Sequence, residues 1–124
     1  VQLTGYNHTT DGIYSYSVDD VWGGSLYVGG GGGFTCCVRL PKVWAPGIKV
    51  EVKWEPHRDT REVRTLQVEV PEYNSTTMST LNVHFLRGGG VKVFATRMAH
   101  DHPDYPFKGP ESYLKEGVPT VSPY

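Results

Sequence analysis

The residues whose types most readily do chemistry form a short histidine and aspartate cluster late in the sequence. His100, Asp101 and His102 are consecutive, and Asp104 follows two residues later. A zinc ion needs three or four ligands that converge in a tetrahedron, and a His-x-His pair on a strand can supply two of them. This pair lies in a proline-rich stretch without a third ligand at a characteristic spacing. We therefore predict a polar loop rather than a metal site, and we expect no cofactor.

Two adjacent cysteines, Cys36 and Cys37, are the next candidates. Neighbouring Cα atoms lie about 3.8 Å apart, which is closer than the usual disulfide range. In a regular strand their side chains point to opposite faces. We therefore expect a buried Cys36 and a surface Cys37 without a bond between them. The alternative is a vicinal disulfide formed in an oxidising compartment. No CxxC spacing or second cysteine pair supports a metal or redox site.

Catalytic patterns are missing from the sequence. There is no G-x-S-x-G nucleophile motif, and adjacent carboxylates at Asp19 and Asp20 on a turn do not flank a glycosidic bond from opposite sides. The glycine run Gly29–Gly33 is followed by neither Gly-Lys-Ser/Thr nor a predicted helix, so it does not predict a phosphate-binding loop. We therefore expect a protein that is not an enzyme.

The composition is that of one folded domain, which we expect to span residues 1–124. Hydrophobic residues make up 38% of the chain and aromatic residues 12%, enough for a core. The net charge of −1 argues against nucleic acid or an anionic membrane as partner, because both need a basic surplus. All 12 basic residues lie from Arg39 onward, whereas Asp11, Asp19 and Asp20 precede it. These acids form either an acidic patch or ordinary solvated loop charges.

The elements that must position these residues are predicted to be β-strands. Alternating apolar and polar residues, separated by Gly, Pro and Asp turns, recur at short intervals without helical periodicity. The predicted strands are 1–4, 13–18, 21–28, 34–40, 48–55, 66–70, 81–86 and 91–96. About eight short strands of this kind indicate an all-β fold: an antiparallel β-sandwich or a partly open barrel, with an irregular tail from Met98 onward.

The alternation also assigns side chains to faces. The strictest pattern lies in Ile48–Glu55, where every second residue from Ile48 to Trp54 faces a core and the charged residues between them face water. In 13–18, Tyr14, Tyr16 and Val18 share one face, and in 34–40 the inward residues are Phe34, Cys36, Val38 and Leu40.

Turn signals separate these strands. The stretch 5–12 is predicted to be turn-rich, Asp19-Asp20 is predicted to form a tight turn, and 87–90 is predicted to close a hairpin. Gly23-Gly24 indicates a bulge or a close backbone approach within its strand.

Aromatic and acidic residues in the first third of the chain are the candidate contacts with a partner. Aromatic side chains are enriched at interface hot spots, and aromatics beside acids suit a protein partner better than a nucleic acid. The alternative is that half or more of these aromatics fill the core. The candidate contact residues are Asp19, Asp20, Trp22, Tyr27, Gly30 and Gly31.

Three motifs together resemble a known bacterial family. They are GYNHT at Gly5–Thr9, a glycine-rich run into FTCCVRLP at Phe34–Pro41, and W-x-P-G from Trp44 into the strand that ends in Trp54. This pattern resembles a family of small envelope lipoproteins long catalogued as a domain of unknown function.

The resemblance implies a function. Such proteins are often encoded beside type VI secretion lipase effectors and are taken to be their cognate immunity proteins. It also implies a periplasmic location, with an anchor on a lipidated cysteine that would precede Val1. We therefore expect the chain to bind a toxic lipase and to block its active site or lid. The alternative is an envelope structural or carbohydrate-binding module, in which surface aromatics would stack on sugar rings.

Overall fold

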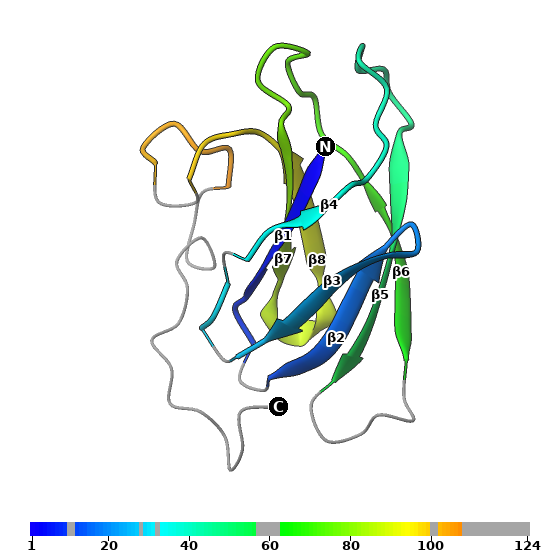
Figure 1. Ribbon diagram of the computed structural model, residues 1–124, viewed down its shortest axis with the longest axis vertical. Coiled ribbons are helices and arrows are strands. Elements are labelled where there is room, and N and C mark those ends of the chain that lie inside the picture. Colours follow the sequence, from blue (N-terminus) through cyan, green and yellow to red (C-terminus); the bar gives the residue numbers. More distant parts are fainter. Residues whose placement is uncertain (10–11, 28, 32, 57–62, 100–101, 108–124) are drawn as a thin grey trace.

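The computed structural model describes residues 1–9, 12–27, 29–31, 33–56, 63–99 and 102–107. Two four-stranded sheets pack face to face as a sandwich (Figure 1). The described elements are β1 (Gln2–Asn7), β2 (Ile13–Val18), β3 (Val21–Leu26), β4 (Thr35–Cys36), β5 (Lys49–Pro56), β6 (Arg64–Glu69), β7 (Thr80–Phe85), the 3₁₀ turn η1 (Arg87–Gly89) and β8 (Val91–Ala95). The all-β sandwich expected from the sequence is confirmed, and its sheets do not close into a barrel.

One sheet has the strand order β4-β1-β7-β8 and the other the order β3-β2-β5-β6. Neighbouring strands are antiparallel with one exception among the described pairs: β1 and β7 run parallel, from Gln2 opposite Thr80 to Asn7 opposite Phe85. The antiparallel pairing expected from the sequence holds for the other described pairs and fails at this one. Antiparallel direction follows readily from a hairpin, but the chain between β1 and β7 passes through the whole of the other sheet.

The core lies between the two sheets. The predicted alternation of the strand after Gly47 is confirmed, because Val50, Val52 and Trp54 of β5 are buried and face β7 and β8. Burial of apolar area contributes about 25 cal/mol for each Å² removed from water. The largest contributions to this core come from side chains of both sheets: Leu3, Tyr16, Val18, Val52, Leu81, Val83 and Phe85.

A bulge in β2 changes the predicted faces. Ile13 pairs with Pro56, but Ser15 already pairs with Glu55, so β2 has one residue more than β5 in this interval. The extra residue is Tyr14, and the inward phase changes there. Ile13, Tyr16 and Val18 are buried while Tyr14 is exposed. The assignment of Tyr14 to the same face as Tyr16 and Val18 was therefore wrong.

The predicted strand 34–40 is mostly irregular. Only Thr35–Cys36 pairs, with the first residues of β1 at the edge of its sheet. Phe34 is 61% exposed, both cysteines are exposed, and only Val38 is fully buried. The expectation of a buried Cys36 is wrong, because two paired residues are too few to hold the chain in strand geometry. The two sulfur atoms are placed as a vicinal disulfide.

Strand β1 extends further than predicted. Gly5–Asn7, expected in a turn, continue the strand because β7 pairs along their whole length. On the other side, Tyr6 forms a bridge with Gly31. Pairing on both sides satisfies the backbone here, so turn-forming residue types do not end the strand.

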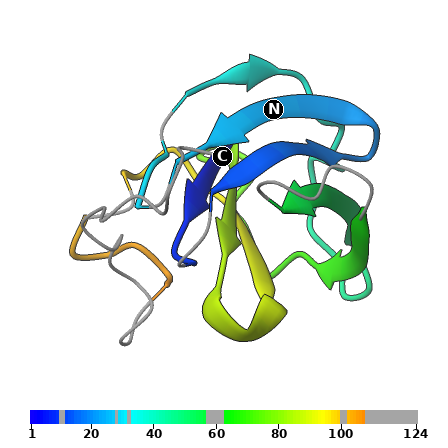
Figure 2. The same ribbon diagram turned by 90° about the horizontal axis from the view of Figure 1, so that it is seen from below.

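Both faces of β7 are buried. Leu81, Val83 and Phe85 face the core, whereas Thr80, Asn82 and His84 point to the other face of the sheet and are buried as well. The segment 102–107 lies beside this outer face, on the side away from β5 and β6 (Figure 2). Its side chains Tyr105 and Phe107 are buried there. This second buried layer was not expected from the sequence.

Candidate binding surfaces and a buried histidine network

The predicted turn at Asp19-Asp20 is confirmed and forms the tip of the β2–β3 hairpin. Val18 pairs with Val21, so the two aspartates alone make the connection. Both have positive φ, 47° and 67°. This left-handed conformation is required at both central residues of a type I′ turn, and aspartate is among the few residues other than glycine that adopt it readily.

The carboxylate of Asp19 has a structural task. Its Oδ1 accepts a hydrogen bond of 2.8 Å from the backbone N–H of Glu51, and its own N–H donates to the carbonyl of Glu51 at 2.9 Å. These bonds hold the tip against β5. A substitution of Asp19 would therefore change the hairpin as well as the surface charge.

Asp20, by contrast, is available to a partner. Its side chain is 85% exposed and lies 3.6 Å from Nζ of Lys53, which also lies 3.3 Å from Glu51. The hydrogen bond to Glu51, with the attraction of both carboxylates, raises the pKa of Lys53. Asp20 and Glu51 therefore flank one ammonium group, and Asp19, whose carboxylate accepts from the backbone of Glu51, adds a third acidic residue to the tip.

Trp22 stands next to this acidic tip and is 63% exposed. It pairs with Ser17, whose neighbours Tyr16 and Val18 point into the core, so the indole faces outward. A tryptophan this exposed does not contribute its apolar surface to the core, and tryptophan is a typical hot-spot residue in protein interfaces. Asp20 and Trp22 together define what we call the hairpin tip site.

The remaining predicted contacts lie elsewhere. Tyr27 follows the other end of β3, about 16 Å along the strand from Trp22 at roughly 3.3 Å per residue. Gly30 and Gly31 belong to the backbone that binds β1, because the carbonyl of Gly30 accepts from the N–H of Asn7 at 2.9 Å. A Cβ at Gly31 would lie 2.6 Å from the carbonyl oxygen of Gly5. The structure therefore separates the six candidates into two groups, and the glycines have a packing role.

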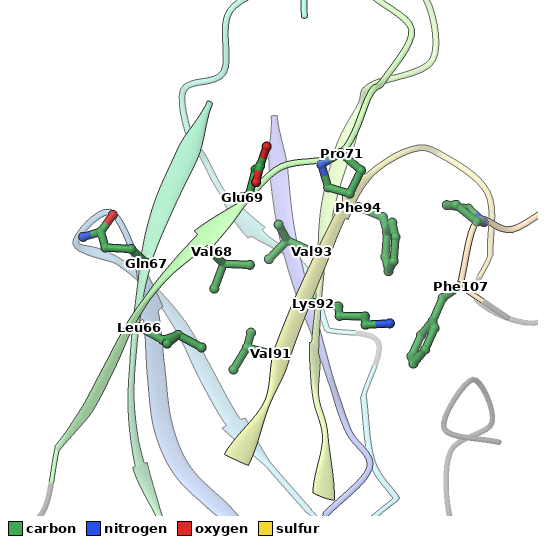
Figure 3. A pocket seen from close by; sticks show the side chains of 11 residues that line it. Leu66, Gln67, Val68, Glu69, Pro71, Val91, Lys92, Val93, Phe94 and Phe107 are labelled. Carbon is green, nitrogen blue, oxygen red and sulfur yellow. The ribbon is translucent and has the colours of Figure 1, made fainter. Parts of the chain in front are cut away.

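A groove runs along the free edge of β8 and was missed from the sequence (Figure 3). Strands β6 and β8 are edge strands of opposite sheets, and they lie against each other at one side of the sandwich. Val68, Val91 and Val93 point into the gap between these strands. Lys92, Phe94 and Phe107 lie on the other side of β8, and the Lys92 ammonium lies 5.2 Å from the centre of the Phe107 ring. The half-exposed Leu66 of β6 also lines this groove.

A chain of hydrogen bonds lies buried behind the sheet of β1 and β7. Nε2 of His8 lies 2.9 Å from Nδ1 of His84, and Nε2 of His84 lies 2.7 Å from the hydroxyl of Tyr105. The exposed fractions of these three residues are 1%, 0% and 1%. Burial, with a smaller contribution from neighbouring Tyr6, raises the pKa of Tyr105, so its hydroxyl stays protonated at neutral pH. Neither histidine had been singled out in the sequence.

The predicted polar loop can be followed in part. His102 is exposed, and its Nδ1 accepts a hydrogen bond of 3.0 Å from the backbone N–H of Asp104. His100 and Asp101 lie outside the described residues. Within the part of the chain that the structure describes, no three His, Cys, Asp or Glu side chains come together to hold a metal ion. No helix among the described residues is long and apolar enough to cross a membrane.

Fold and surfaces define a small β-sandwich protein with two exposed candidate contact surfaces, the hairpin tip site and the β8 groove. The model of a family described as a protein of unknown function (DUF3304) matches residues 6–93, and the chain belongs to this family. The match runs from β1 into β8 and includes His8 and His84. No curated protein and no solved structure matches the chain at a significant level.

Proposed function

We propose that this protein is an immunity protein that binds and inhibits a cognate type VI secretion lipase effector. The motifs at Gly5–Thr9, Phe34–Pro41 and Trp44–Trp54, which resemble an envelope lipoprotein family, are the starting point. The observation that carries the proposal is the hairpin tip site, where an exposed indole stands beside an exposed carboxylate on a rigid turn. On the same resemblance we place the protein in the periplasm, with the full-length form anchored by a lipid.

The mechanism that this surface supports is steric. The hydrogen bonds between Asp19 and Glu51 hold the tip in one conformation, so little entropy is lost when it binds. An indole that enters the substrate mouth or the lid hinge of a lipase would exclude the lipid without any chemistry. A stable interface of this kind buries about 1,600 Å² in total, with a few anchoring residues contributing most of the binding energy.

The β8 groove offers a second contact surface for the same partner. An edge strand accepts an extended segment of another protein through main-chain hydrogen bonds, and side-chain pockets beside it add specificity. Here Val68 and Val91 line one side of β8, and Phe94 and Phe107 line the other. An effector loop could add a strand to β8 while the tip contacts a different region.

The experiment is an inhibition assay with the purified chain and the lipase encoded beside its gene, using phospholipid vesicles as substrate. We expect stoichiometric inhibition by the wild type. Trp22→Ala should weaken binding by at least about 30-fold, the effect of a hot-spot loss near 2 kcal/mol. Asp20→Lys should slow association in a salt-dependent manner. Tyr27→Ala, an exposed aromatic at the far end of β3, is the matched control and should leave the affinity unchanged.

The outcomes separate the function from the site. If the wild type neither binds nor inhibits the neighbouring lipase, the immunity function is refuted. If the wild type inhibits and Trp22→Ala has no effect, the tip is not the contact. Phe94→Glu then tests the groove, where a buried carboxylate beside the partner would abolish binding.

A further inference from the structure

The buried chain His8–His84–Tyr105 links three separate elements. His8 follows β1, His84 lies in β7, and Tyr105 lies in the segment 102–107 that covers the outer face of the sheet. Further ring contacts surround His84: Tyr6 stacks on it at 4.9 Å, and Phe107 meets it edge to face at 5.0 Å. The hydrogen bond between His84 and Tyr105 therefore joins the covering segment to the sheet.

The geometry limits how many protons the two imidazoles can hold. A hydrogen bond between Nε2 of His8 and Nδ1 of His84 needs one nitrogen with a proton and one without. Two neutral rings satisfy this, and so does a single extra proton, because His84 can then donate to both His8 and the Tyr105 oxygen. A second proton would place N–H against N–H and two positive charges within one buried pair. The folded pair therefore holds at most one proton more than the neutral state.

Among the residues that the structure describes, the charged groups near the pair do not favour protonation. From η1, the guanidinium of Arg87 donates through Nε to the carbonyl oxygen of His8 at 3.3 Å. From β8, the Lys92 ammonium lies over Phe107, the ring that contacts both histidines. The titratable groups that face the pair from β1 and from the covering segment are the phenols of Tyr6 and Tyr105. His102 and Asp104 in the same segment are exposed.

We propose that this chain is an acid-sensitive latch: at neutral pH it fixes the segment 102–107 on the sheet, and below about pH 6 it releases that segment. In the unfolded chain both imidazoles titrate near pH 6.5. Because the unfolded or released state binds more protons than the latched state, the stability of the latched state rises with pH and is lost as pH falls through that range. A difference of one proton reduces the latching equilibrium constant tenfold for each pH unit below about 6.

Release would also alter the β8 groove. Phe107 lines the groove beyond Phe94 and packs on His84, so the wall of the groove depends on the latch. The hairpin tip site lies in the other sheet and does not contact this segment. The latch can therefore be tested without the lipase, and its failure would leave the proposed binding through the hairpin tip site unaffected.

The test is urea denaturation of the wild type from pH 7.5 to pH 5, above the range in which carboxylates titrate. We expect the unfolding equilibrium constant to increase about tenfold per pH unit below about pH 6 while the segment stays latched, and to level off once the segment is released. His8→Gln keeps a side chain that can hydrogen-bond to His84 and removes one titrating ring. The unfolding equilibrium constant of this variant should therefore rise by a factor about ten times smaller per pH unit than that of the wild type. His102→Gln removes an exposed histidine as a control and should match the wild type. A wild-type slope equal to that of His8→Gln would overturn the proposal.

A second measurement locates the effect and does not depend on that variant folding. Amide hydrogen exchange of the wild type, corrected for intrinsic rates, should show loss of protection in 102–107 at pH 5.5 while β5 stays protected. Tyr105→Phe removes the hydroxyl that is hydrogen-bonded to Nε2 of His84, so its covering segment should open at a higher pH than in the wild type. Equal protection of 102–107 at both pH values, or no shift in Tyr105→Phe, would refute the latch.

Discussion

The substitution Gly23→Ala tests the close packing of the two sheets at a single methyl group. A Cβ at Gly23 would lie 2.7 Å from Cε1 of Tyr16, with two further ring atoms nearer still. Carbon atoms in contact lie about 3.5–4.0 Å apart, so the ring would have to move by about 1 Å. On the side of the other sheet the ring closely approaches the backbone of Gly5, where a Cβ would lie 2.7 Å from the Tyr16 hydroxyl oxygen. Glycines of both sheets thus enclose this ring.

The magnitude follows from this enclosure. Inserting a methyl group into a tight core costs about 1–3 kcal/mol, and a ring that is 2% exposed and enclosed in this way belongs at the upper end. We expect a loss of about 3 kcal/mol in the free energy of unfolding. With a urea dependence of about 1.5 kcal/mol per molar, the midpoint should fall by about 2 M.

Two variants isolate the cause. Gly33→Ala adds a methyl group with no atom within 4 Å and should change stability by less than about 0.5 kcal/mol. Tyr16→Leu removes the ring atoms that collide, so Gly23→Ala should cost at least about 1 kcal/mol less in that background. If Gly23→Ala costs under 1 kcal/mol, or if its cost is unchanged by Tyr16→Leu, the packing argument is wrong.

Two further predictions concern polar groups in the interior. Burial, with a smaller contribution from Tyr6, raises the pKa values of Tyr16 and Tyr105 well above that of a free phenol. The two neutral phenols therefore stabilise the fold below about pH 10, where free tyrosine ionises, and this stabilisation is lost as pH rises further. Their tyrosinate absorbance should therefore appear only together with loss of the β circular dichroism signal, and ionisation of all tyrosines in the folded protein would contradict this. Asn82→Leu removes an amide nitrogen that lies 3.0–3.2 Å from three backbone carbonyl oxygens, and it should cost about 2–3 kcal/mol in urea denaturation. Gln2→Leu at an exposed position of β1 should cost little, and equal losses would refute the prediction.

Local rules predicted the elements whose environment is local. The alternation in 48–55 predicts a strand with one face toward water, and β5 has such a face. Asp19-Asp20 forms the turn because aspartate tolerates positive φ. Gly23 has no side chain, which permits the close approach of the Tyr16 ring. Each of these features depends on residues next to one another in the chain or directly across a hairpin.

Features that depend on distant partners were not predictable in this way. The bulge at Tyr14 is defined only by the register with β5, some 40 residues later, at Ile13 opposite Pro56. The candidate site was divided for a similar reason: Trp22 and Tyr27 are close in sequence, but a strand places them at opposite ends of β3. The β8 groove needs two edge strands from different sheets, which no single stretch of sequence describes.

Strand β7 shows why the second buried layer was missed. Thr80, Asn82 and His84 alternate with apolar residues, which is the pattern of a strand with one face exposed to water. The same alternation also fits a strand whose polar face is covered by another part of the chain. The described part of this cover is the short segment 102–107. Among the described residues it is joined to the sheet by the buried hydrogen bond between His84 and Tyr105 and by ring contacts of Tyr105 and Phe107 with His84 and Phe94. A cover held by titratable groups depends on pH in a way that an apolar one does not, and for this reason we assign the acid sensitivity of the fold to this face.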